Sequence, residues 1–189
     1  MANLYIIAGC NGAGKTTTSY TVLPEMLNCK EFVNADEIAR GLSPFQPETV
    51  SFQAGRIMLK RIRELMLGRN DFSFETTLST RSYVQLIKHA KKLGYTIILI
   101  YFWLESSNLA KARVQARVEK GGHNILPEVI ERRYIRGREN FFTAYKDLAD
   151  SWMIYNNSFE TPEIIAKGNA SMVSYIYNDD LWKKLRLTK

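Results

Sequence analysis

The stretch at residues 9–16 constrains the fold of this chain more than any other segment. It reads Gly9-Cys10-Asn11-Gly12-Ala13-Gly14-Lys15-Thr16, which matches the pattern G-x-x-x-x-G-K-[ST] at every fixed position. An apolar run at residues 4–8 precedes it, and a helical pattern over residues 15–27 follows it. Strand, glycine-rich loop and helix in this order form the phosphate-binding loop of P-loop proteins. We therefore predict an α/β fold that binds a nucleoside triphosphate through this loop.

Each residue type in the loop has its own task. The glycines let the backbone turn with its N–H groups pointing inward, at the positive end of the following helix, where an anion is stabilised. Lys15 is expected to reach the β- and γ-phosphates, and Thr16 to supply a hydroxyl to Mg²⁺. The motif therefore predicts ATP (or GTP) and Mg²⁺ as cofactors. The expected nucleotide contacts are Gly9, Asn11, Gly12, Ala13, Gly14, Lys15, Thr16 and Thr17.

Strand-like and helix-like segments alternate along the rest of the chain. The expected strands are residues 4–8, 31–35, 71–74, 96–104, 152–155 and 163–166. The expected helices are residues 15–27, 47–67, 81–93, 106–120, 127–149 and 170–185. This order predicts a P-loop NTPase fold, a doubly wound parallel sheet of about five strands with helices on both faces. A chain of 189 residues is expected to form a single domain, residues 1–189.

Charge and composition limit the classes of partner. The formal net charge is +7, but the Lys and Arg residues are spread over helical stretches without an aromatic and basic stripe, which argues against nucleic acid. No run of 18 apolar residues is present, so we expect no membrane partner and a cytoplasmic location. The two cysteines are too few for a disulfide framework or a zinc site.

Two carboxylates follow expected strands, where the ligand edge of such a sheet lies. Asp36 could be the base that takes a proton from the acceptor hydroxyl, or it could cap a helix over residues 37–40. Glu75 could hold Mg²⁺ through water or orient the substrate, or it could belong to a turn before the next helix. Because the strand at residues 96–104 ends without an aspartate, Glu75 or Asp36 is the expected carboxylate on the metal side.

Several arginines follow in a pattern that suits a mobile lid. Arg113 and Arg117 are four residues apart and share one helix face. A glycine hinge at residues 121–122 with His123 comes next, and Arg132 and Arg133 lie on the following helix. Arginines on a lid can match the charge that spreads over the transferred phosphoryl group, so we predict a lid around residues 113–133. For any single arginine, a solvated helix face is the alternative, and His123 is expected to be a structural hydrogen bonder. The candidate catalytic residues are Asp36, Lys15, Arg113, Arg117 and Arg133.

Taken together, these residues resemble the zeta-toxin-like P-loop kinases. The resemblance is carried by residues 9–16, Asn34-Ala35-Asp36-Glu37, Phe74-Glu75-Thr76-Thr77-Leu78, Arg113-Val114, Arg117-Val118, Gly121-Gly122-His123 and Arg132-Arg133-Tyr134. It implies ATP or GTP as phosphate donor, Asp36 as general base, Glu75 and Thr77 near an acceptor sugar, and lid arginines on the γ-phosphate. The better-known zeta toxins phosphorylate UDP-N-acetylglucosamine and are restrained by an antitoxin, so a small-molecule hydroxyl acceptor and an antitoxin protein are the implied partners.

The acceptor is less constrained than the donor. Toxins of that group carry a glycine where this chain has Thr76. A hydroxyl of a sugar, in a nucleotide sugar such as UDP-N-acetylglucosamine, is the leading hypothesis, with Arg81 as a cation for its diphosphate. A kinase that acts on nucleic acid and an NTP-binding regulatory module with a protein partner are the alternatives.

Overall fold

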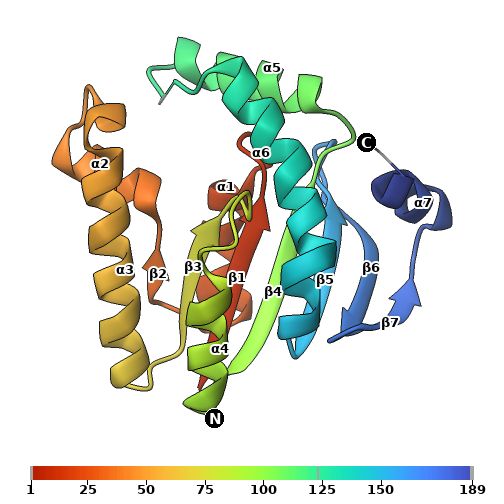
Figure 1. Cartoon of the computed structure of the whole chain (residues 1–189). Coiled ribbons are helices and arrows are strands. Elements are labelled where there is room, and N and C mark those ends of the chain that lie inside the picture. The colour runs from red at the N-terminus through yellow and green to blue at the C-terminus, as the bar shows by residue number, and fades with distance from the viewer. Residues whose placement is uncertain (1, 123, 188–189) are drawn as a thin grey trace.

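The computed structural model describes residues 2–122 and 124–187, and its centre is a seven-stranded sheet (Figure 1). The strands lie in the order β2-β3-β1-β4-β5-β6-β7. Their bounds are β1 Asn3–Gly9, β2 Phe32–Val33, β3 Phe72–Thr76, β4 Thr96–Trp103, β5 Ser151–Asn156, β6 Glu163–Asn169 and β7 Met172–Ile176. The first five strands of this order pair in parallel, as predicted for a doubly wound sheet.

Helices cover both faces of the sheet. Figure 1 shows α4 and α6 in front of it, α1 behind it, and α5 above the carboxyl ends of the strands. The helices are α1 Lys15–Thr21, α2 Ala35–Leu42, α3 Ser51–Leu67, α4 Val84–Lys92, α5 Ser107–Glu119, α6 Pro127–Asn140 and α7 Asp179–Leu187. The short segments Val22–Met26, Pro47–Val50, Phe141–Tyr145 and Lys146–Leu148 form π or 3₁₀ turns that continue helices. In the described residues, no helix is long and apolar enough to cross a membrane.

The unbroken apolar strand predicted at residues 96–104 forms the core. Residues 99–103 of β4 are all buried, because β4 has β1 and β5 beside it and helices on both faces. Trp152 of β5 continues this core toward the C-terminus and stacks on Trp182 of α7, with 6.2 Å between the ring centroids. The sheet and its helices therefore share one core.

The register of the parallel strands brings the functional segments together. Ile7 of β1 lies opposite Glu75 of β3, and Gly9 lies opposite Phe102 of β4. Glu75 therefore leaves the sheet directly beside the start of the glycine-rich loop. The sequence motifs at residues 9–16, 34–37 and 75–77 meet at one edge of the sheet, as expected for an open α/β sheet.

The C-terminal part of the chain differs from the sequence prediction. The segment at residues 163–166 was expected to extend a parallel sheet, but β6 runs antiparallel to β5, and β7 runs antiparallel to β6. The predicted helix at residues 170–185 is wrong in its first half, which forms β7, and correct from Asp179 onward. Ala170 has a φ of 47°, so a tight turn reverses the chain and aligns the β-branched and aromatic residues of β7 with β6.

Candidate active site

The glycine-rich loop has the backbone geometry that its sequence predicts. Gly9 has a φ of 144°, and a Cβ at this position would lie 2.3 Å from the carbonyl oxygen of Phe102. Gly14 has a φ of 78°, and a Cβ there would lie 2.4 Å from Nδ2 of Asn157. Any side chain at either position would therefore collide with the neighbouring strand end, in a conformation that favours glycine. The loop is closed by the amide of Ala13, which donates to the carbonyl of Cys10 at 3.2 Å.

A buried polar cluster lies beneath this loop. Lys15 Nζ is 3.3 Å from Oε1 of Glu75 and donates to the carbonyl of Cys10 at 2.9 Å. The Thr16 hydroxyl donates to Oε2 of Glu75 at 2.7 Å. The Lys15 side chain is 5% exposed and that of Glu75 10%, so the pair is largely shielded from solvent screening. Lys15 and Thr16 thus form one unit with Glu75, which lies 59 residues after Thr16 in the sequence.

Asn34 completes the cluster and was not among the predicted site residues. Its Nδ2 donates to Oε2 of Glu75 at 3.0 Å, and its Oδ1 accepts from the amides of Asp36 at 2.8 Å and Glu37 at 3.4 Å. Asn34 is therefore the N-cap of α2, and the alternative in which Asp36 caps this helix is wrong. An asparagine directly before a helical pattern is a signal that could have identified the cap, but its bond to Glu75 depends on the tertiary fold.

Asp36 lies in the first turn of α2 and is exposed to solvent. A carboxylate in this position is stabilised by the positive end of the helix. Burial lowers the pKa of the Arg133 guanidinium on α6, and the charge of Asp36 opposes this shift. Arg133 Nη1 also donates to Oδ1 of Asn11 in the glycine-rich loop at 3.1 Å. Arg133 thus contacts the phosphate loop and lies within electrostatic range of the first turn of α2.

Arg113 takes a different position from Arg133. Its guanidinium donates to the carbonyls of Asn157 at 2.7 Å and Ser158 at 3.0 Å, in the loop after β5. Arg113 lies beside the phosphate loop, because a Cβ on Gly12 would be 3.4 Å from the Cβ of Arg113. Asn157 is a further residue that sequence reasoning missed: its Nδ2 donates to the carbonyl of Ala13 at 2.7 Å. No local pattern marks Asn157, since its partner is 144 residues away.

The predicted lid corresponds to α5, α6 and their connection. The amide of Gly121 donates to the carbonyl of Val118 at 2.8 Å, and that of Gly122 to Arg117 at 2.9 Å, which ends α5. A Cβ on Gly122 would lie 2.5 Å from Cγ of Arg117, so the stem of this arginine packs on the glycine pair. His123 lies outside the described residues. The closing motion of the lid remains a prediction.

The segment after β3 holds the predicted acceptor residues. Thr77 Oγ1 shares a hydrogen bond with the hydroxyl of Ser79 at 2.9 Å. Leu78 is buried and has a φ of 53°, which costs a non-glycine residue about 1–3 kcal/mol. Its carbonyl accepts from Asn140 at 2.8 Å, so α6 holds this strained turn in place. Arg81 donates to Asn140 and Thr143, each at 3.3 Å, which places its guanidinium against α6.

Comparison with known proteins identifies the family. Residues 2–166 match the family described as zeta toxin. This chain is a member of the zeta toxin family. A relative from Haemophilus influenzae (strain ATCC 51907 / DSM 11121 / KW20 / Rd), described as an uncharacterized protein, is 31% identical over 127 residues. The aligned part covers 67% of this chain and 88% of the relative.

Solved structures support the fold of this zeta toxin family member. The crystal structure of AvrRxo1-ORF1:-ORF2 with ATP has a TM-score of 0.75 at 16% sequence identity. The match covers 98% of this chain and 63% of the AvrRxo1 chain. The PezAT chromosomal toxin-antitoxin system of Streptococcus pneumoniae has a TM-score of 0.70 at 13% identity, over 100% of this chain and 80% of that one. The predictions of a zeta-toxin-like P-loop kinase and of its fold are confirmed.

Cys10 of this zeta toxin family member is predicted to be an inert thiol. It is 3% exposed, and burial raises its pKa from 9.0 to about 11, against the opposing effect of the Lys15 charge. A rise of this size lowers the thiolate fraction at pH 8 by about a hundredfold. We expect iodoacetamide at pH 8 to leave Cys10 unlabelled in the native protein and to label it in urea, as followed by mass spectrometry. Rapid labelling of the native protein at Cys10 would contradict this environment.

Proposed function

We propose that this zeta toxin family member transfers the γ-phosphate of ATP to a hydroxyl group of a sugar, in a nucleotide sugar such as UDP-N-acetylglucosamine. The observation that carries the proposal is the cluster in which Glu75 contacts both Lys15 and Thr16 while Asn34 joins Glu75 to the turn that bears Asp36. One end of this cluster suits the donor phosphates, and the other presents a carboxylate to an acceptor.

The donor side has residues that fit ATP and Mg²⁺. Lys15 and the backbone of residues 9–16 would hold the β- and γ-phosphates, with the Thr16 hydroxyl and the Glu75 carboxylate on the metal side. The 2.7 Å distance between Thr16 Oγ1 and Glu75 Oε2 provides two adjacent oxygen donors, which suit Mg²⁺. Held on the side of Thr16 and Glu75, Mg²⁺ would supply positive charge that offsets the charge developing on the transferred phosphate.

A cavity of about 560 Å³ lies beside the phosphate loop and would hold the base of the nucleotide. Arg113, Ser158 and Phe159 line it together with the next two residues of the same loop. Because Arg113 borders both this cavity and Gly12, a nucleotide with its phosphates in the loop can direct its base toward the cavity. GTP would enter in the same way, so the preference for ATP over GTP depends on contacts with the base.

The acceptor side requires a base and groups that orient a polyol. Asp36 would accept the hydroxyl proton as the acceptor oxygen bonds to the γ-phosphorus and the bond to the β-phosphate oxygen breaks, releasing ADP. Thr77 follows the neighbouring strand β3 and would hydrogen-bond the sugar, beside the carboxylate of Glu75. Arg133 donates to Asn11 and interacts electrostatically with Asp36, so its charge would act near the transferred group.

The Asp36→Asn substitution separates the base from the scaffold. Because Asn34 and not Asp36 caps α2, we expect the melting temperature and the affinity for ATP to stay near those of the wild type. Transfer should fall by about 10²–10⁴, the usual contribution of a positioned base. The matched control is Glu37→Gln in the same turn, which should retain transfer. A loss of stability without a loss of turnover per folded molecule, or equal losses in both variants, would contradict the role of Asp36.

The acceptor is tested by direct product analysis. The protein is incubated with Mg²⁺, ATP and UDP-N-acetylglucosamine, and both ADP release and the mass of the sugar nucleotide are followed. We expect faster ADP release and a product heavier by one phosphate. An unchanged slow hydrolysis of ATP without such a product would overturn the sugar-nucleotide acceptor, and transfer to other hydroxyl compounds would then be screened.

We also propose a protein partner of the antitoxin type. The support is that the two structural neighbours above are described as a complex of two open reading frames and as a toxin-antitoxin system. The test is to express the chain together with the product of the gene beside its own. Copurification that lowers phosphotransfer is the expected result, and separate elution with unchanged activity would overturn the proposal.

A further inference from the structure

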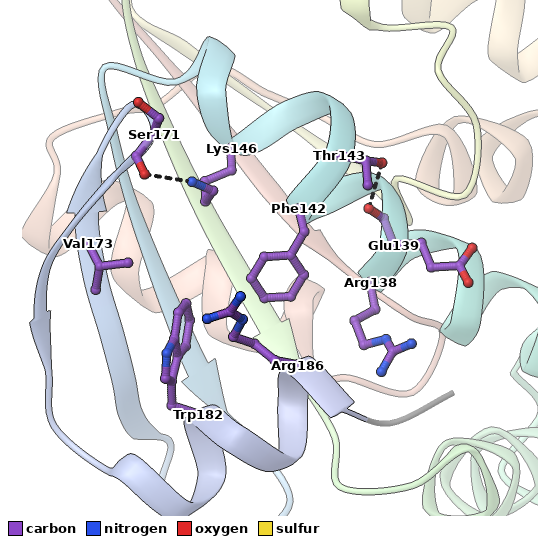
Figure 2. A pocket seen from close by; sticks show the side chains of 9 residues that line it. All are labelled: Arg138, Glu139, Phe142, Thr143, Lys146, Ser171, Val173, Trp182 and Arg186. Atoms are coloured by element: carbon purple, nitrogen blue, oxygen red, sulfur yellow. Dashed lines mark hydrogen bonds between the residues drawn. The ribbon is translucent and has the colours of Figure 1, made fainter.

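A second cavity lies on the C-terminal side of the molecule. It has a volume of about 530 Å³ and is bordered by α6, the turn Phe141–Tyr145, the β6–β7 hairpin and α7 (Figure 2). None of the residues that line it belongs to the cluster of Lys15, Thr16, Asn34 and Glu75. Its size is within the range of cavities that bind small molecules, about 300–1,000 Å³. This cavity is called the Trp182 cavity below.

Positive charge dominates the wall of the Trp182 cavity. Arg138, Lys146 and Arg186 line it, with Glu139 as the carboxylate. Figure 2 shows the carboxylate of Glu139 turned away from Trp182 and Arg186. Lys146 is already engaged, because it donates to the carbonyl of Ser171 at 2.9 Å and lies 3.1 Å from a carboxylate oxygen of Asp147. Arg186, which is exposed, is therefore the cation of the cavity that a ligand can reach most readily.

The arginines are poorly matched by the protein itself. Arg138 is 7% exposed, and its hydrogen bond to the carbonyl of Leu185 is long, at 3.3 Å. Across residues 2–122 and 124–187, no carboxylate lies within ion-pair distance of Arg138 or Arg186. A guanidinium has five N–H donors in a planar fork, and a charge removed from water without a counter-ion destabilises the fold. An anion beside the exposed Arg186 would supply a counter-ion to this guanidinium, and the charge of Arg138 in the same wall would add to the attraction.

The opposite wall is aromatic and firmly supported. The rings of Phe142 and Trp182 meet edge to face with 5.8 Å between centroids, and Trp152 stacks behind Trp182 with the planes 7° apart. The guanidinium of Arg186 lies 5.8 Å from the centre of a Trp182 ring. Trp182 is itself 7% exposed, so its accessible edge, the Phe142 ring and the Arg186 guanidinium place apolar surface and a charge side by side. This arrangement suits a flat apolar group that carries an anionic substituent.

We propose that the Trp182 cavity binds a small organic anion, with its carboxylate or phosphate on Arg186 and its flat body against Phe142 and the accessible edge of Trp182. This site is separate from the phosphotransfer site, so it does not depend on the identity of the acceptor. Arg138 lies on α6, the helix that also carries Arg133, and a ligand in the cavity would therefore contact the helix that joins the two sites.

The test uses phenyl phosphate and benzoate as probes, with benzamide as the uncharged analogue of benzoate and inorganic phosphate as the anion without a ring. Binding is followed by the indole N–H signal of Trp182 in two-dimensional NMR, assigned with Trp182→Phe, in the presence of saturating ADP to occupy the phosphate loop. We expect at least one of the two aromatic anions to shift this signal. If benzoate binds more tightly, the cavity prefers a carboxylate, and benzamide should bind about tenfold or more weakly than benzoate. If phenyl phosphate binds more tightly, the cavity prefers a phosphate, and inorganic phosphate should bind about tenfold or more weakly than phenyl phosphate.

Arg186→Gln is the main variant, because Arg186 is exposed and its loss should not unfold the protein. It should weaken binding of the probe about tenfold or more, whereas Arg136→Gln, an exposed position on α6 outside the cavity, should not change it. The affinity for ADP should be the same in the wild type, Arg186→Gln and Arg136→Gln. The proposal is overturned if neither aromatic anion shifts the Trp182 signal, if benzamide and inorganic phosphate bind as tightly, or if Arg186→Gln leaves the affinity unchanged.

Discussion

Lys15→Ala is expected to abolish productive ATP binding and phosphotransfer. Lys15 Nζ lies at the centre of the glycine-rich loop, 2.9 Å from the carbonyl of Cys10 and 3.3 Å from Glu75. Removing it takes away the lysine that reaches the transferred phosphates, and it leaves the mostly buried Glu75 carboxylate without its cation. We therefore expect ATP affinity measured by calorimetry and turnover measured by ADP release both to fall to background.

The control for this variant is Lys92→Ala at the exposed end of α4, which changes the net charge equally. It should bind and turn over ATP like the wild type. Circular dichroism must show that the Lys15 variant is folded, because a lost ion pair at a buried site lowers stability. Wild-type affinity and turnover in folded Lys15→Ala would refute the assignment of residues 9–16 as the phosphate-binding loop.

Loss of the arginine that contacts the transferred phosphoryl group is expected to lower the rate of transfer by about 10³–10⁵-fold. We expect this loss of rate in Arg133→Ala, because Arg133 contacts Asn11 and interacts electrostatically with Asp36. We also expect it in Arg117→Ala, because Arg117 lies beside the glycine pair that ends α5. Arg113→Ala should mainly weaken ATP affinity, because its guanidinium holds the carbonyls of Asn157 and Ser158 beside the loop.

The three variants are measured side by side in single-turnover experiments with saturating ATP. Arg132→Ala is the matched control, because Arg132 neighbours Arg133 on α6 but is exposed. One or two large effects on the rate constant, with Arg132→Ala near wild type, would support a catalytic lid. Uniformly small effects at the three positions would remove the lid from the mechanism.

The sequence was sufficient to predict the parallel part of the fold because that part follows from local patterns. The apolar run of β4 and the glycine-rich loop between β1 and α1 each specify their own conformation. The C-terminal hairpin was not predictable in this way. Residues 172–176 are mostly exposed on an edge strand, so β7 lacks the buried alternation that marks a strand, and its pairing with β6 depends on the turn at Ala170.

The candidate site was predictable where a residue belongs to a motif and not where it depends on distant contacts. Lys15, Thr16 and Glu75 were predicted and lie together. Asn34 and Asn157 were missed because each acts through a hydrogen bond across the fold, to Glu75 and to Ala13. Long polar side chains add a further difficulty, since sequence spacing does not determine where a guanidinium such as that of Arg81 will end.

The central claim is that the cluster around Glu75 moves the γ-phosphate of ATP to another molecule. The most direct measurement follows the label of [γ-³²P]ATP after incubation of the protein with Mg²⁺ and a pool of small hydroxyl compounds that includes UDP-N-acetylglucosamine. We predict that wild-type protein moves the label into a small organic product and that Asp36→Asn moves about 10²–10⁴ less. Release of the label only as inorganic phosphate, at the same rate with and without the pool, would contradict the claim.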